Sequence, residues 1–262
     1  SAASDVYKRQ VLIGALALLA LALSSRNSRL GFRDLPLPGV IFAGLSIGLY
    51  NLLFFLAVIE AGVGVGTAIA IGSAPVWVTL YEITVQRQMP GPVRAGGQLL
   101  AIAGACLLVF SGGTNSGSTL GYLLAAAAGT AYASYSLATS RISQRAPSST
   151  LAAATFGTAA LALLPVLFLV PVCWAAAPSA WPGLVFLGVG ATAFSYALYT
   201  WGLGRVTAST AVTLALAEPL TAWLLAIFVL DESVSAARLA GAAVLLAGLA
   251  IVTLAPRRPG AR

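Results

Sequence analysis

The sequence predicts an all-α membrane protein made of two inverted-topology repeats of five helices, with about nine of the ten transmembrane helices present. Three observations predict this fold: the composition, a series of apolar runs of helical length, and an internal repeat. Hydrophobic residues make up 59% of the chain and charged residues only 8%, whereas a soluble domain carries roughly 25% charged residues. A water-soluble fold could not cover such an apolar interior with so few charges.

A helix that crosses a bilayer needs about 20 mainly apolar residues. The apolar runs, bounded by polar residues, Pro or Gly, predict nine such helices, approximately at 8–24, 37–59, 65–85, 95–111, 118–139, 150–171, 181–203, 208–230 and 236–255. The first has only thirteen uninterrupted apolar residues, from Val11 to Leu23, which is short for a span.

The first ten residues differ in composition from the rest of the chain. They contain Lys8, the only lysine, whereas the chain has thirteen arginines. Residues 1–10 have no apolar region typical of a signal peptide. We interpret them as a non-native segment that resembles a translated sequencing adapter, and the alternative is an ordinary polar N-terminus.

Arginine is distributed over alternate loops. It occurs in 24–36, 86–94, 140–149 and the tail 257–262, and the loops 111–117 and 172–180 carry no charge. Cytoplasmic loops of membrane proteins carry an excess of Lys and Arg, so this pattern predicts a cytoplasmic C-terminus. The first predicted helix would then begin outside, and a protein with both ends inside would need one more helix before it.

An offset of 144 residues aligns 75–104 with 219–248 without a gap. The matched residues include Pro75 with Pro219, Arg94 with Arg238, Gly97 with Gly241, and Gly104 with Gly248. The offset spans five predicted helices, an odd number, so the two copies would have opposite orientations in the membrane. Inverted repeats of this kind are common in secondary transporters, whose substrate site lies near the bilayer midplane.

Several of these residues form a recognisable pattern. In the first copy they are Asn51, Phe55, Ala57, Thr67-Ala68-Ile69, Ala74-Pro75, Gly97 and Gly104; in the second they are Tyr199, Trp201, Arg205-Val206, Ala217-Glu218-Pro219-Leu220, Leu230-Asp231-Glu232, Arg238, Gly241 and Gly248. This pattern resembles the EamA family of the drug/metabolite transporter superfamily over roughly residues 11–256. The second copy resembles the family more closely, because Arg87-Gln88 stands in the first copy where the second has Asp231-Glu232.

The resemblance implies a domain plan and an activity. Residues 11–111 would form the first EamA repeat without its first helix, 118–256 the second repeat, and 257–262 a cytoplasmic tail. The implied protein is a multi-pass transporter of the plasma membrane that exports or exchanges a small metabolite, such as an amino acid or a drug-like compound, by alternating access. The motif does not identify the substrate.

Glu218 is the strongest candidate for a functional residue. It lies about ten residues into the predicted helix 208–230, close to the bilayer midplane, and precedes Pro219. A charged side chain at that depth costs on the order of 2.5–3.5 kcal/mol on insertion scales, so such residues usually face a cavity or a partner. Pro219 would kink or loosen the helix and free a carbonyl that can line a polar cavity. We expect Glu218 to couple transport to protons, and the alternative is a protonated side chain that stabilises helix packing.

Other polar and aromatic residues are candidates for the cavity lining. They are Asn51, Ser73, Trp77, Tyr132, Tyr135, Tyr196, Tyr199, Trp201, Thr213 and Thr221. For each aromatic residue, packing or a position at the membrane interface is an equal alternative. Glu82 lies near the end of the predicted helix 65–85, where it would pair with Arg87 or reach the interface. The glycine pairs Gly97/Gly104 and Gly241/Gly248, and the segment 44–48, predict close helix packing.

The sequence argues against several other classes of protein. It has no His, and its two cysteines, Cys106 and Cys173, lie in apolar runs, so it predicts no disulfide, metal site or cofactor. The net charge of +7 is spread between apolar runs, which does not indicate a nucleic-acid partner. The expected partners are a small-molecule substrate and the lipid bilayer, and a homodimer is an open alternative. An uncoupled channel or facilitator, or a membrane-embedded enzyme, are the remaining alternative functions.

Overall fold

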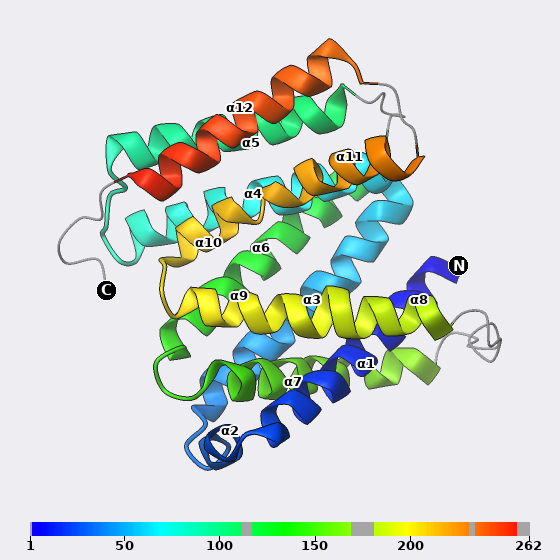
Figure 1. Cartoon of the computed structure of the whole chain (residues 1–262), viewed down its shortest axis with the longest axis vertical. Coiled ribbons are helices and arrows are strands. Elements are labelled where there is room, and N and C mark those ends of the chain that lie inside the picture. The colour runs from blue at the N-terminus through cyan, green and yellow to red at the C-terminus, as the bar shows by residue number, and fades with distance from the viewer. Residues whose placement is uncertain (1, 112–116, 169–180, 231–233, 256–262) are drawn as a thin grey trace. The chain divides into compact units, whose positions relative to one another are not determined.

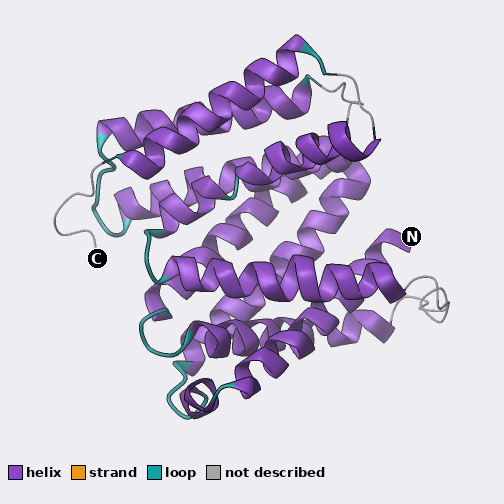
Figure 2. Cartoon of the chain, in the orientation of Figure 1, coloured by secondary structure: helices purple, strands orange, loops and turns teal. Residues whose placement is uncertain are grey.

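The computed structural model describes residues 2–111, 117–168, 181–230 and 234–255, and these residues form helices joined by turns, with no strand among them (Figure 2). Seven helical segments in this part of the chain are long and apolar enough to cross a membrane. The prediction of an all-α membrane protein is therefore confirmed.

The chain divides into two compact units, each with residues from both halves of the sequence. Unit 1 comprises Ser1–Asn51 and Ser134–Val206, and unit 2 comprises Leu52–Ala133 and Thr207–Arg262. Two long helices, α3 (Leu37–Ala61) and α6 (Thr119–Ile142), contribute to both units.

The other helices, most of them labelled in Figure 1, belong to one unit each. Unit 1 also contains α1 (Ala2–Ser24), α2 (Arg26–Gly31), α7 (Ser148–Phe168), α8 (Trp181–Val185), the π-helix η3 (Phe186–Phe194) and α9 (Ser195–Leu203). Unit 2 also contains α4 (Val63–Thr84), α5 (Pro92–Phe110), α10 (Ala208–Leu214), α11 (Ala217–Leu230) and α12 (Ala236–Leu254).

Each predicted helix has a helical counterpart, but four details of the prediction were wrong. The helix α1 begins at Ala2 rather than at residue 8. The predicted loop 24–36 contains α2, a helix too short and polar to form an apolar run. The predicted helix 181–203 has a π-helical middle, and 208–230 is interrupted between α10 and α11.

Two of the nine predicted helices are not among the seven candidate spans. In α1 the described apolar stretch is the shorter segment Ile13–Ser24. The helix α6 carries Ser, Thr, Tyr and Arg side chains among its alanines, and these lower its mean hydropathy.

The position of α2 is set by hydroxyl groups at the start of α7. The Thr150 hydroxyl donates to the Ser28 carbonyl at 2.8 Å, and the hydroxyls of Ser28 and Ser149 share a hydrogen bond of 2.8 Å. Hydrogen bonds of side chains to backbone carbonyls fix short polar helices that have no apolar face to bury.

The glycines of the internal repeat hold α5 and α12 together in unit 2. These helices lie side by side (Figure 1) and run antiparallel, because Gly97 lies against Gly248 and Gly104 against Gly241. A Cβ at Gly241 would approach the backbone nitrogen of Leu108 to 2.6 Å. Only residues without a side chain allow backbones to pack so closely, so the packing predicted for these glycines is confirmed.

Close packing at small residues also occurs in unit 1. A Cβ at Gly44 on α3 would approach the backbone oxygen of Thr155 on α7 to 2.7 Å. At Gly14, on α1, a Cβ would lie 2.8 Å from the Cβ of Thr192 in η3. The packing role predicted for the segment 44–48 is thus confirmed.

We expect Gly104→Ala to destabilise the protein strongly, because its Cβ would overlap the backbone of Leu245. Overpacking of this kind costs about 1–3 kcal/mol or more. Gly96→Ala is the matched control on the same helix, since its Cβ meets nothing within 4 Å. The melting temperatures of the two variants are measured by thermal unfolding in detergent, and that of Gly104→Ala should be lower. Equal melting temperatures would contradict the packing described for α5 and α12.

Candidate functional site

The ten residues predicted for the substrate site are divided between the two units. Asn51, Tyr135, Tyr196, Tyr199 and Trp201 belong to unit 1, and Ser73, Trp77, Tyr132, Glu218 and Pro219 belong to unit 2. Within each unit the structure brings some of them into a shared environment and leaves others apart.

The membrane span that carries Glu218 is broken. The helix α10 ends at Leu214 and α11 begins at Ala217. Between them the N–H of Leu216 donates to the carbonyl of Thr213 at 3.1 Å, and the N–H of Glu218 donates to the carbonyl of Ala215 at 3.0 Å. Each bond joins residues three positions apart, as in a tight turn. The predicted helix 208–230 is therefore two half-helices, and the disturbance expected at Pro219 takes the form of a break just before it.

Pro219 fits the position of the break, although its counterpart Pro75 lies inside the continuous helix α4. The residue sits in the first turn of α11. Backbone N–H groups there have no partner within the helix, so proline loses nothing at this position. In the middle of one continuous helix it would remove a hydrogen bond and clash with the preceding turn. Starting a new helix just before Pro219 avoids both costs.

Glu218 faces away from the hydrophobic core of unit 2. Its neighbours Leu216 and Leu220 are buried in a cluster that includes Ile71 of α4 and Leu245 of α12. The side chain of Glu218 is exposed, and no described residue makes a hydrogen bond or an ion pair with its carboxylate. The start of α11 provides partial positive charge, which favours a carboxylate there. The apolar membrane span thus contains, at its break, an acidic group that has no partner in the part of the chain that the structure describes.

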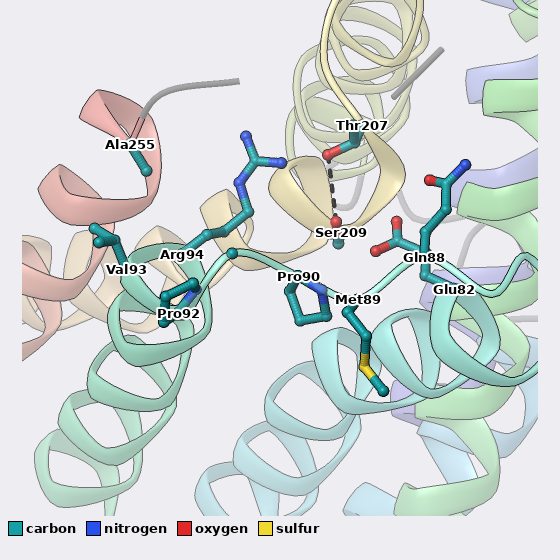
Figure 3. Close-up of a pocket in the computed structure, with 11 residues that line it drawn as sticks. Glu82, Gln88, Met89, Pro90, Pro92, Val93, Arg94, Thr207, Ser209 and Ala255 are labelled. Carbon is teal, nitrogen blue, oxygen red and sulfur yellow. Dashed lines mark hydrogen bonds between the residues drawn. The ribbon is translucent and has the colours of Figure 1, made fainter. Parts of the chain in front are cut away.

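A polar pocket lies at one end of unit 2, between the end of α4 and the starts of α5 and α10 (Figure 3). Its volume is about 210 Å³. Its charged residues are Glu82 and Arg94, and its other polar side chains are those of Gln88, Thr207 and Ser209. Thr207 caps α10 by accepting a hydrogen bond from the N–H of Thr210 at 3.3 Å.

Glu82 does not have the partner that the sequence suggested. Its carboxylate faces the hydroxyl and the backbone N–H of Ser209, and its charged neighbour is Arg94 rather than Arg87. Arg87 has a positive φ of 55° in the exposed loop that follows α4. The prediction used distance along the chain, whereas α10 and α5 bring Ser209 and Arg94 to Glu82 from other parts of it.

Three of the predicted tyrosines form an aromatic cluster in unit 1. The Tyr135 ring, 1% exposed, is stacked on Tyr199 with centroids 6.1 Å apart, and Tyr196 packs against Phe156 at 4.5 Å. The hydroxyls of Tyr199 and Ser136 share a hydrogen bond of 2.9 Å. The cluster buries Tyr135 and leaves Tyr196 and Tyr199 half-buried, so these two tyrosines can contribute to a polar and aromatic surface.

The π-helix η3 directly precedes the two half-buried tyrosines. The hydroxyl of Thr192 donates to the carbonyl of Leu187 at 2.9 Å, and that of Ser195 donates to the carbonyl of Gly190 at 3.2 Å. Both bonds span five residues, the spacing of the wider π turn. These hydroxyls therefore stabilise the wider turn, which determines how the side chains of α9 are oriented about the helix axis.

The other predicted residues have local roles. The Asn51 amide donates to the carbonyl of Ile47 in its own helix at 2.7 Å. Ser73 packs against α6 at Gly129, and Tyr132 is buried in unit 2.

The exposed Trp201 ring lies 3.7 Å from the guanidinium of Arg205, a cation–π contact. Trp77 is exposed on α4. Thr213 and Thr221 donate to the carbonyls four residues before them.

Gln98 is a structural residue that the sequence interpretation missed. Its buried amide donates to the carbonyl of Pro75 and to the hydroxyl of Thr79, both at 2.9 Å, and so joins α5 to α4. A glutamine within a predicted span was a usable signal, because an amide in an apolar environment needs partners. Cys106 is a free thiol, and Cys173 and the acidic pair Asp231-Glu232 lie outside the described residues.

With this fold and these sites described, comparison with known proteins identifies the class. The chain matches the EamA-like transporter family over residues 119–254. It belongs to that family and is a multi-pass membrane transporter.

Two relatives and a solved structure are similar to it. The uncharacterized transporter YwfM of Bacillus subtilis is 36% identical over 250 residues, which cover 95% of this chain and 83% of that protein. The aromatic amino acid exporter YddG of Ancylobacter novellus is 28% identical over 193 residues, or 70% of this chain and 65% of that protein. A crystal structure 24% identical in sequence has the same fold, with a TM-score of 0.81 over 97% of this chain and 89% of that one.

We expect Gln98→Leu to lower stability by about 1–3 kcal/mol, because the Thr79 hydroxyl would lose its partner in an apolar environment. Gln86→Leu, in the exposed loop after α4, is the matched control. Chemical unfolding in detergent measures both variants. If Gln98→Leu were as stable as the control, the bridge between α4 and α5 would have no energetic role.

Proposed function

We propose that the protein is a secondary transporter of the plasma membrane that exports a small metabolite, such as an amino acid, by alternating access coupled to protons. Glu218 carries the proton in this proposal. The observation that supports it is the exposed, unpaired carboxylate at the break between α10 and α11. A charge in an apolar span costs several kcal/mol, and intramembrane acids of this kind are typical of proton relays.

The break also supports a substrate site near Glu218. Discontinuous spans leave backbone N–H and C=O groups without helical partners, and transporters use such groups to bind substrates and coupling ions. In lipid these groups would be unsatisfied, so irregular backbone at this depth is expected to line a cavity. The same break therefore supplies the carboxylate and the polar backbone that a coupled carrier needs.

The contacts of α5 with α12 support the proposal of inverted repeats. The offset of 144 residues relates Gly97 to Gly241 and Gly104 to Gly248, and the observed contacts join Gly97 to Gly248 and Gly104 to Gly241. Such crossed pairing is expected when two equivalent helices pack antiparallel about a local two-fold axis. The acidic residue itself is not repeated, because Glu218 corresponds to Ala74 (218 − 144 = 74).

The proposed orientation has the C-terminus and the loops 86–94 and 140–149 in the cytoplasm, because these segments carry arginine. In a variant without native cysteines, a cysteine in place of Gln86 should react with an impermeant maleimide only after the cells are opened. A cysteine in place of Ser118 should react in intact cells. The reverse pattern would require the opposite orientation in the membrane.

Glu218→Gln should abolish transport driven by a pH gradient, because an amide cannot exchange a proton. Counterflow, which exchanges labelled for unlabelled substrate without net proton movement, should persist. Proteoliposomes supplied with a panel of labelled L-amino acids, including the aromatic ones, measure both activities. Glu60→Gln is the control, since Glu60 is exposed at the end of α3 and accepts a hydrogen bond from Ser118 at 2.9 Å.

The transport activities that Glu218→Gln loses and keeps distinguish a proton-coupled carrier from the alternatives. Loss of pH-driven flux with retained counterflow supports coupling through Glu218. If pH-driven flux survives in Glu218→Gln, then Glu218 is not the coupling residue. Substrate flux that is neither saturable nor capable of counterflow in the unmodified protein would indicate a channel instead.

A further inference from the structure

The polar pocket of unit 2 lies apart from Glu218, at the far end of α10. Its lining includes Ser209, the second residue of α10, whereas Glu218 lies nine positions further along the chain (218 − 209 = 9). The rest of α10 and the turn before α11 lie between the two residues in the chain. The pocket is therefore a distinct polar site on the same span.

The two charged residues of this pocket do not neutralise each other directly. In Figure 3 the Glu82 carboxylate and the Arg94 guanidinium lie on either side of Ser209. They interact through space, and no ion pair joins them among the described residues. Ser209 lies near the Glu82 carboxylate (Figure 3). The pocket thus presents a negative and a positive group at separate positions.

Arg94 lines the pocket (Figure 3). Its Nε atom is buried and has no hydrogen-bond partner among the described residues. Buried donors usually have an acceptor, and the guanidinium fork is well suited to bind a carboxylate through two parallel N–H groups.

The charges and the size of the pocket restrict the class of ligand. An anion such as phosphate would be attracted by Arg94 and repelled by Glu82, and a simple cation would experience the reverse. A ligand with one charge of each sign, a few ångströms apart, satisfies both residues. The volume of about 210 Å³ is below the roughly 300–1,000 Å³ of pockets for drug-sized ligands, which favours a small metabolite.

We propose that this pocket is a loading site for α-amino acids, in which Arg94 binds the carboxylate and Glu82 the ammonium group of the zwitterion. The proposal rests on the transport function argued above and specifies its substrate class. The pocket lies where α4 ends and α5 begins, beside the arginine-bearing loop 86–94 that the proposed orientation places in the cytoplasm. An exporter would receive its substrate at this end of the molecule.

The test measures binding to the full chain in detergent. The common L-amino acids are first screened for an increase in melting temperature, because a ligand that binds the folded state stabilises it. The amino acid with the largest effect is then compared with its methyl ester, which lacks the negative charge, and its N-acetyl form, which lacks the positive charge. The dissociation constants are measured by calorimetry.

The unmodified protein should bind the zwitterion about ten- to a hundredfold more tightly than either blocked form, the range expected for one hydrogen bond to a charged group. Arg94→Gln should lose the discrimination against the methyl ester but keep that against the N-acetyl form. Glu82→Gln should lose the discrimination against the N-acetyl form but keep that against the methyl ester. The measured quantity is the ratio of the affinity for the zwitterion to that for each blocked form, within one variant. A general loss of stability lowers both affinities and leaves this ratio unchanged.

Arg87→Gln and Glu60→Gln are the matched controls, because neither residue lines the pocket; both should bind all three ligands like the unmodified protein. The proposal is overturned if no amino acid stabilises the protein, if the blocked forms bind equally well, or if the two variants lose affinity for all ligands in the same ratio. Since this assay needs no membrane or pH gradient, its outcome is independent of whether Glu218 couples transport to protons.

Discussion

The break between α10 and α11 is the constraint on which the proposed mechanism depends. A membrane span must satisfy its own backbone groups, and this span departs from regular helical hydrogen bonding at Leu216 and Glu218, whose N–H groups donate to carbonyls three residues before them. The break is held firmly on one side, because Leu216 is only 1% exposed and packs in the cluster with Leu220 and Leu245. Glu218, between the two leucines, is therefore presented from a fixed backbone.

The rigidity of that backbone comes from the pair of helices α5 and α12. Their glycines allow backbone contact along Gly97, Gly104, Gly241 and Gly248. The cluster that buries Leu216 draws residues from both of these helices and from α4. A packed interior responds as a unit rather than deforming gradually. Movement of α5 and α12 would carry the break and its carboxylate along with them.

The same span connects the two polar sites of unit 2. Ser209, near the start of α10, lies beside Glu82 in the pocket, and Glu218 follows the end of α10. A ligand that changes the contact of Glu82 with Ser209 acts directly on the helix that leads to the break. This connection is a physical route by which substrate loading could influence protonation, since both sites act on one short helix.

Much of the fold could be predicted from the sequence because the bilayer imposes a simple rule on it. Apolar runs of about 20 residues identified the helices, and the spacing of Gly97 and Gly104 identified a packed face. Pro219 indicated a disturbance of the span 208–230. Its position next to Glu218 could not show whether the span bends or breaks, because that depends on the burial of Leu216 against α4 and α12.

Other features depend on contacts between distant parts of the chain. The π-helical turns at Thr192 and Ser195 lie in an apolar run with no residue pattern that distinguishes them from an α-helix. For Glu82 the sequence left two alternatives, pairing with Arg87 or reaching the interface, whereas the packing of α5 and α10 brings Arg94 and Ser209 near it. The ten residues predicted as one site belong to two units, a division that periodicity and spacing do not reveal.

The most direct test of the central claim is the release of protons when substrate binds. In a weakly buffered detergent solution containing a pH indicator, a substrate amino acid identified by binding or counterflow is added to the purified protein. If substrate displaces the proton of Glu218, the unmodified protein acidifies the solution and Glu218→Gln, with comparable substrate occupancy, does not. Substrate binding without proton release, or equal release by the Glu218→Gln variant, would contradict the assignment of Glu218 as the coupling group.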